Sequence, residues 1–111
     1  MKLKNVFKRI QHISEVNPKS LIERALKLSE ECGELAQAAL SYENVSGCGY
    51  KLLDASDVQE EAVDCVLVAL DIFFQTGGCV ADFKKLLGTK ADKWERVLRE
   101  HDDFDKDYEI S

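Results

Sequence analysis

The stretch AVDCVLVALDIFF, residues 62–74, decides the expected fold because it contains only two charged side chains, Asp64 and Asp71. A helix that is apolar on nearly every side is usually a buried one, so this segment is predicted to form the central helix of the protein. A buried carboxylate without a partner costs several kcal/mol even after its surroundings relax. Asp64 and Asp71 therefore need a cationic side chain, a bound proton or a metal ion.

The sequence on both sides of this stretch predicts an all-α protein. One proline and six glycines leave long uninterrupted segments, and apolar residues recur at helical spacing. Four helices are expected, over residues 3–16, 20–42, 57–75 and 80–100. Asn17–Pro18 ends the first, the Ser20–Glu23 capping box opens the second, and Asp57 opens the third. Gly77–Gly78 ends the third, and Gly88–Thr89 marks a place where the fourth could break.

Length and charge predict the domain organisation. The 111 residues suffice for one domain, expected over residues 1–100, with a loop over 43–55 that returns the third helix antiparallel to the second. Between Glu100 and Glu109 the chain carries six acids and one lysine, and its overall net charge is −6. Residues 101–111 are therefore predicted to be an acidic tail. This charge argues against a nucleic-acid partner, which requires clustered Lys and Arg.

Hydropathy and cysteine spacing indicate the cellular compartment in which the protein is expected to act. No run of 18 apolar residues is present, so no membrane-spanning helix is expected. The N-terminal residues are interrupted by charges, unlike a signal peptide, and a cytoplasmic location is the expectation. The four cysteines, Cys32, Cys48, Cys65 and Cys79, include no C-x-x-C pair. They are predicted to be free thiols that serve as small core residues.

Two pairs of acids on the second and third helices predict a cation site. Residues three apart lie on one helix face, so Glu31 and Glu34 can direct their carboxylates to one point. Glu61 and Asp64 can do the same. An antiparallel pairing of the two helices would then bring all four carboxylates together. Oxygen ligands select hard cations such as Mg²⁺, Mn²⁺ or Ca²⁺, and Mg²⁺ suits a phosphorylated substrate.

A di-iron centre is a less favoured use of these acids, because helix-bundle sites of that kind use Glu-x-x-His. Neither His12 nor His101 follows an acid at that spacing. The alternative to a magnesium site that stays open is a solvated acidic face, with Asp64 paired to an arginine such as Arg96.

Two motifs carry a resemblance to a known family: EECGEL at residues 30–35 and EEAVDC at residues 60–65. They resemble the E-E-x-x-E and E-x-x-D signature of MazG-like nucleoside triphosphate pyrophosphohydrolases, which belong to the all-α NTP pyrophosphatase superfamily. The resemblance spans about residues 21–99. It implies a MazG-like four-helix bundle and a Mg²⁺-dependent cut between the α- and β-phosphates, for which Mn²⁺ can substitute.

The same resemblance implies roles for individual residues. The implied metal ligands are four carboxylates: Glu31, Glu34, Glu61 and Asp64. The implied catalytic residues are Glu30 and Glu34, either of which would act as general base toward the attacking water. Asp71 falls where the family often has Asn and is carried over as a substrate-binding residue.

The fourth helix carries four cations at three-residue intervals: Lys90, Lys93, Arg96 and Arg99. Its segment KWER, residues 93–96, is similar to the K-aromatic-x-R segment of some family members. This similarity implies that Lys93 and Arg96 bind the phosphates of the substrate. The alternative is a surface stripe that balances the acids of the third helix.

The expected partners and function follow from the resemblance and from the apolar central helix. Family members are dimers or tetramers, and the central helix offers more apolar surface than one thin bundle covers. A homo-oligomer joined through the central helices is therefore expected, with a dimer favoured. The expected function is hydrolysis of a (d)NTP to a (d)NMP and pyrophosphate in nucleotide-pool house-cleaning. The alternatives are a non-catalytic helical dimerisation or binding module on the same fold, and a phosphoribosyl-ATP pyrophosphohydrolase-like activity.

Overall fold

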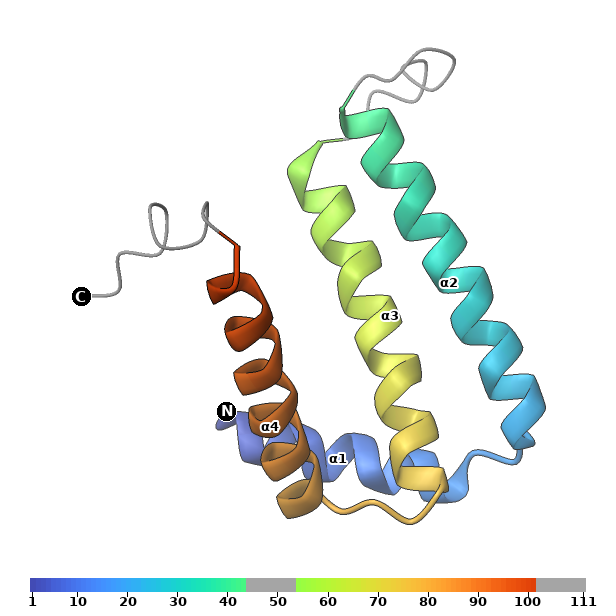
Figure 1. Cartoon of the computed structure of the whole chain (residues 1–111). Coiled ribbons are helices and arrows are strands. Elements are labelled where there is room, and N and C mark those ends of the chain that lie inside the picture. Colours follow the sequence, from blue (N-terminus) through green and yellow to red (C-terminus); the bar gives the residue numbers. More distant parts are fainter. Residues whose placement is uncertain (44–53, 102–111) are drawn as a thin grey trace. The chain divides into compact units, whose positions relative to one another are not determined.

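A computed structural model describes residues 1–43 and 54–101, and all regular structure within these ranges is helical. Its helices are α1 (Leu3–Val16), α2 (Leu21–Tyr42), α3 (Ala55–Gln75) and α4 (Val80–Arg99), as Figure 1 shows. The predicted all-α class and the four predicted helices are thereby confirmed. Most of the expected loop over 43–55 and of the expected acidic tail over 101–111 lies outside the described residues.

The chain divides into two compact units, Met1–Gly78 and a second unit that begins at Cys79. In the first unit, α2 and α3 run antiparallel and pack side by side, and α1 packs on α3 (Figure 1). The antiparallel pairing of the second and third helices was expected from the sequence. The second unit contains α4.

Side chains cap the starts of α2 and α3. Ser20 and Glu23 form the predicted capping box, with the Ser20 N–H donating to Glu23 Oε1 at 2.9 Å. The predicted start of α3 at Asp57 is wrong, because the N-cap is Asp54. The Asp54 carboxylate accepts from the Ser56 and Asp57 N–H groups, and the Asp54 N–H donates to the Asp57 carboxylate at 2.9 Å. Asp57 therefore occupies the third helical position, where it reciprocates the cap.

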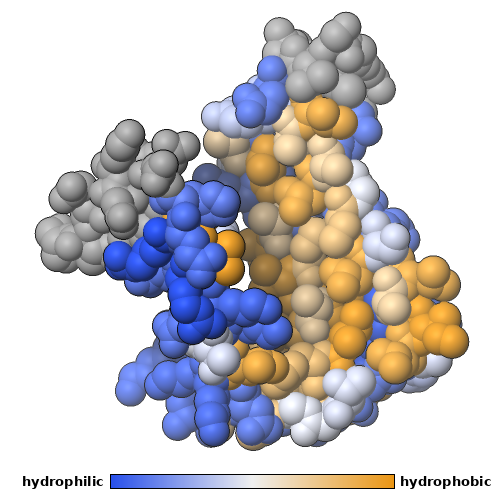
Figure 2. Space-filling view, in the orientation of Figure 1, coloured by the Kyte–Doolittle hydropathy of each residue, from blue (hydrophilic) through white to orange (hydrophobic). Residues whose placement is uncertain are grey.

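The buried core between α2 and α3 is small. Among the described residues, the buried apolar side chains are Ala38, Leu70 and Phe74. In contrast, a face of α3 formed by Val63, Val66 and Leu67 is exposed, with 57%, 52% and 42% of each residue accessible. Figure 2 shows apolar residues along α2 and α3 in orange. The prediction of a buried helix holds for Leu70 and Phe74 but not for this face, whose exposure agrees with the expectation that the helix offers more apolar surface than one thin bundle covers.

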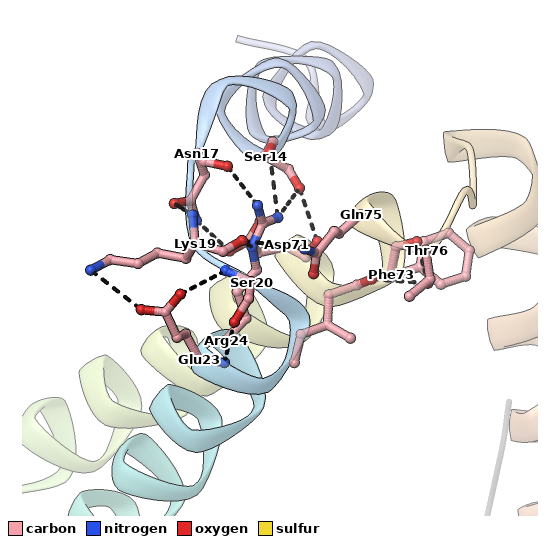
Figure 3. A network of polar contacts seen from close by, with 11 residues as sticks. Ser14, Asn17, Lys19, Ser20, Glu23, Arg24, Asp71, Phe73, Gln75 and Thr76 are labelled. Atoms are coloured by element: carbon pink, nitrogen blue, oxygen red, sulfur yellow. Dashed lines mark hydrogen bonds and ion pairs between the residues drawn. The ribbon is translucent and has the colours of Figure 1, made fainter.

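Arg24 holds the end of α1 against α2 and α3 (Figure 3). It is only 5% exposed, and its Nη1 donates to Asp71 Oδ1 at 2.7 Å. The same guanidinium donates to the backbone carbonyls of Ser14, Asn17 and Lys19 at 3.4, 2.6 and 2.9 Å. Asn17 Nδ2 donates to the other Asp71 carboxylate oxygen at 2.9 Å. A cationic side chain therefore compensates the charge of Asp71.

The helix α4 is continuous from Val80 to Arg99, so it does not break at Gly88–Thr89. Thr89 Oγ1 donates to the Lys85 carbonyl at 3.1 Å, which satisfies the hydroxyl within the helix. At its start, the Cys79 N–H donates to the Asp82 carboxylate, and hydrogen bonds from Cys79 lower the pKa of Asp82.

No single helix in the described residues is long and apolar enough to cross a membrane, and α3 with α4 meet that criterion only as a pair.

Candidate metal centre

Three of the four predicted ligands come together. Glu31 and Glu34 lie three residues apart on α2, and Glu61 reaches the same point from α3. One carboxylate oxygen from each lies within 4.8 Å of the other two. The spacing on α2 and the antiparallel pairing with α3 produce this arrangement, as the sequence predicted. We call Glu31, Glu34 and Glu61 together the carboxylate cluster.

Two oxygens of the carboxylate cluster are buried and lack a hydrogen-bond partner within the described residues: Glu31 Oε2 and Glu61 Oε2. Glu31 as a whole is only 8% exposed, whereas Glu34 is exposed. A buried carboxylate oxygen without a donor costs free energy, because it has lost its hydration and gained nothing in return. A cation bound among the three side chains would satisfy both oxygens.

Burial raises the pKa of Glu61. The negative charges of Glu34, Asp64, Glu31 and Glu60 raise the pKa of Glu61 further, in that order of importance. Desolvation and like charges both disfavour the ionised carboxylate. Without a cation, Glu61 therefore binds a proton more readily than an ordinary glutamate does.

Asp64, the fourth predicted ligand, lies close enough for its charge to act on Glu61, but it is not one of the three converging groups. Its side chain is exposed and forms no ion pair with the described residues of the first unit. An exposed aspartate next to the carboxylate cluster needs no compensating partner. The alternative in which Asp64 pairs with Arg96 stays open, because Arg96 belongs to the second unit.

Lys27 is the residue of this region that the sequence reasoning missed. Its Nζ lies 3.0 Å from Glu31 Oε1 and 3.4 Å from Glu30 Oε1. Hydrogen bonds to Glu31 and then to Glu30 raise the pKa of Lys27. The signal was present in the sequence, because Lys27 precedes these acids by three and four positions on one helix face. Glu30 is exposed and is tied to Lys27 instead of joining the carboxylate cluster.

Asp71 lies elsewhere on α3, in the contact with α1. Both of its carboxylate oxygens are used, one by Arg24 at 2.7 Å and the other by Asn17 at 2.9 Å. Its backbone carbonyl accepts from the Ser14 hydroxyl at 2.9 Å. A substrate that binds Asp71 would have to replace these contacts, so the substrate-binding role stays a prediction.

Lys93 and Arg96 lie on α4, in the second unit. Both are exposed, and neither forms an ion pair among the described residues. Arg99, further along the helix, is paired with Glu95 at 3.1 Å. Lys93 and Arg96 are therefore available to an anionic ligand, and their contact with substrate phosphates stays a prediction.

The cysteines differ from their expected role. Cys32, Cys65 and Cys79 are free thiols, as predicted. Cys32 and Cys79 are exposed, however, so they are not core residues, and only Cys65 is half-buried. Burial raises the pKa of Cys65, as do a hydrogen bond to Cys32 and the charges of Cys32, Glu31 and Asp64. Cys48 lies outside the described residues.

The chain matches no protein-family model, no curated protein and no solved structure.

Proposed function

We propose that the chain is a Mg²⁺-dependent nucleoside triphosphate pyrophosphohydrolase of the MazG-like type, acting in the cytoplasm on the nucleotide pool. It would hydrolyse a (d)NTP to a (d)NMP and pyrophosphate. The observation that carries this proposal is the convergence of Glu31, Glu34 and Glu61 within 4.8 Å, with two buried oxygens lacking a partner among the described residues.

The donor set fits the proposed ion. All three converging groups offer carboxylate oxygens, which favour Mg²⁺ and Mn²⁺ over softer metals. Glu31, Glu34 and Glu61 would hold the ion, and exposed Asp64 would complete the set. Bound there, the ion neutralises triphosphate charge and lowers the pKa of a coordinated water.

The general base and the phosphate-binding groups are side chains of the protein itself. Glu34 is exposed at the edge of the carboxylate cluster, where its carboxylate can accept the proton of the water that attacks the α-phosphorus. Glu30 is the alternative general base, held near the site by Lys27. The oxygen of the water bonds to the α-phosphorus while the bond to the bridging oxygen breaks, and pyrophosphate leaves. Lys93 and Arg96 would bind its phosphates.

A homodimer is part of the proposal. The exposed face formed by Val63, Val66 and Leu67 is the surface that a second copy would cover. Burying apolar area on this face would stabilise both copies at about 25 cal/mol per Å². The same contact would place two carboxylate clusters in one assembly.

The test is pyrophosphate release from a panel of canonical and modified NTPs and dNTPs, and from phosphoribosyl-ATP, with Mg²⁺ or Mn²⁺. Glu34→Gln and Glu61→Gln are expected to lose turnover. Glu60→Gln is the matched control, because Glu60 is an exposed neighbour of Glu61 outside the carboxylate cluster. Orthophosphate as the only inorganic product would contradict cleavage between the α- and β-phosphates.

One observation favours a second candidate function. The ion pair between Lys27 and Glu31 already neutralises part of the carboxylate cluster without a metal. This favours a non-catalytic helical binding module, in which the acids serve only to bind a cation or a basic partner. The two candidates differ in one result: the module would bind Mn²⁺ or a partner while releasing no pyrophosphate from any nucleotide in the panel.

A further inference from the structure

Lys27 of α2 is the cation that lies beside the carboxylate cluster. Its Nζ lies 3.0 Å from Glu31 Oε1 and 3.4 Å from Glu30 Oε1. In the described part of the chain, the contact with Glu31 is the one ion pair that the carboxylate cluster forms. Glu31 Oε2 and Glu61 Oε2 are buried without a hydrogen-bond partner among the same residues. Lys27 therefore neutralises only part of the cluster and leaves two of its buried oxygens unsatisfied.

The two partners of this ion pair differ in how firmly they are held. The Glu31 side chain keeps only 10% of its surface exposed, whereas the Lys27 side chain keeps 52%. An ammonium that is half exposed loses little free energy when it leaves an ion pair, because water solvates its charge. Lys27 can therefore exchange Glu31 for another acceptor while Glu31 stays in place.

We propose that Lys27 is a switchable counter-ion, which pairs with Glu31 in the cation-free protein and donates to a phosphate oxygen of the triphosphate when the site is loaded. This inference rests on the proposed function, because it assigns a further substrate-binding residue to the same site. The residue is on α2, one turn before Glu31, and sequence reasoning did not include it among the phosphate-binding groups.

Electrostatics gives the reason for the exchange. A cation held by Glu31, Glu34 and Glu61 repels the Lys27 ammonium at short range, and both positive groups compete for the charge of Glu31. A triphosphate brings several negative charges to the same place. The ammonium then gains a phosphate acceptor, and a charge-assisted hydrogen bond of this kind is among the strong ones.

The position of Lys27 suits this contact. Ligands at adjacent positions of an octahedral Mg²⁺ lie about 3 Å apart, because each Mg–O bond is about 2.1 Å long. A phosphate oxygen that shares the ion with Glu31 would therefore lie close to the carboxylate that Lys27 contacts at 3.0 Å. Rotation within the flexible lysine side chain suffices to reach it without a movement of α2. Glu30, at 3.4 Å, holds the ammonium beside the site during the exchange.

The exchange makes the site prefer the cation–triphosphate complex to the free cation. A free cation must compete with Lys27 for Glu31, whereas the complex supplies a new acceptor for the ammonium. Lys27 also belongs to the same compact unit as the carboxylate cluster, unlike Lys93 and Arg96. One unit therefore contains both the proposed cation ligands and a phosphate-binding cation.

The experiment measures two affinities of the full chain by isothermal titration calorimetry: for Mn²⁺ alone, and for tripolyphosphate at saturating Mn²⁺. Tripolyphosphate is the probe because it carries the phosphates without a base or a sugar. Lys27→Met should bind Mn²⁺ several-fold more tightly than the wild type, and tripolyphosphate about tenfold more weakly. Lys27→Arg keeps the charge and the donors, so it should bind tripolyphosphate nearly as the wild type does. Lys19→Met is the matched control and should change neither affinity, because Lys19 forms only an exposed pair with Glu23 at 4.0 Å.

The opposite signs of the two changes distinguish this role from a structural one, in which Lys27→Met would weaken both affinities. An unchanged tripolyphosphate affinity would overturn the phosphate contact, and an unchanged Mn²⁺ affinity would overturn the competition for Glu31. The same changes in Lys19→Met would overturn the direct contact, because they would reveal an effect of net charge.

Two further results concern the proposed function instead of Lys27. Failure of the wild type and of every variant to bind Mn²⁺, with circular dichroism showing folded helices, would overturn the cation site and the role of Lys27 with it. The expected changes in both affinities, without pyrophosphate release from any nucleotide, would support the role of Lys27 and overturn the proposed catalysis.

Discussion

Glu31 of α2 and Glu61 of α3 face each other with one buried oxygen each that has no hydrogen-bond partner among the described residues. Lys27 neutralises only the other oxygen of Glu31, at 3.0 Å. The contact between the two glutamates is therefore unfavourable without a bound cation. The site therefore carries more negative charge than Lys27 neutralises, and this excess is what the variants below are designed to change.

Glu61 should make the stability of the metal-free protein depend on pH. Because its pKa is raised in the folded state, the folded protein binds the proton more tightly than the unfolded chain. The destabilisation by ionised Glu61 is therefore present above the raised pKa and disappears as the pH falls toward the ordinary glutamate value. Glu34, Glu31, Asp64 and Glu60 are the charges that face it.

Glu61→Gln tests this pH dependence in the presence of a chelator. The variant should unfold at a higher temperature than the wild type near neutral pH, and the difference should shrink as the pH falls toward the ordinary pKa of a glutamate. Glu60→Gln, at the exposed neighbouring position, should give a much smaller difference. A Glu61→Gln variant that is less stable than the wild type near neutral pH would contradict the expected sign.

Lys27→Met should increase the response of the protein to a divalent cation. Removing the ammonium leaves Glu31 without its ion pair, so the metal-free protein should lose stability. A cation should then stabilise the variant more than the wild type, because it no longer competes with Lys27 for Glu31. The measurement is the thermal midpoint with Mn²⁺ and with a chelator. Lys19→Met is the control, because Lys19 forms only an exposed pair with Glu23 at 4.0 Å.

Asp71→Asn should destabilise the first unit by about 3 kcal/mol, because it leaves the buried Arg24 guanidinium without its counter-charge. The lower end of the range for a broken buried ion pair applies, since the Asp71 side chain keeps 19% of its surface exposed. Urea unfolding of Asp71→Asn, Arg24→Met and the double variant would give the coupling energy. A variant with unchanged stability and a raised KM would instead support the predicted contact between Asp71 and substrate.

Leu67→Lys should convert the expected dimer to a monomer. Val66 and Leu67 belong to the exposed apolar face of α3, and a charge placed within a buried interface is strongly unfavourable. Light scattering at several protein concentrations measures the change in mass. Val16→Lys is the matched control, because Val16 is a similarly exposed apolar residue on α1. A wild-type chain that is monomeric at all concentrations would contradict the expectation.

Local signals in the sequence predicted the helices well. The Ser20–Glu23 box and Gly77, which has a φ of 98°, lie where the helix ends were expected. The start of α3 was misplaced because Asp54 and Asp57 form a reciprocal cap, and either aspartate alone resembles an N-cap. The backbone distinguishes them, because Asp54 is extended (φ −104°, ψ −177°) and the helix begins at the next residue.

The convergence of Glu31, Glu34 and Glu61 was predictable because it needs only helical spacing and an antiparallel pairing. The partner of Asp71 was not, because Arg24 is 47 positions away and the contact depends on where α1 packs. Contacts set by the register between helices are therefore what the sequence reasoning missed.

The position of Arg24 also has a consequence for the order of folding. The guanidinium joins α1 to Asp71, and the Ser14 hydroxyl reaches the Asp71 carbonyl over 57 positions of sequence. Such distant contacts form late, because the loop between them must close first. The antiparallel pair α2–α3 should therefore form before α1 docks. Amide hydrogens of α1 should then exchange with solvent faster than those in the middle of α2, even though both helices are fully formed in the native state.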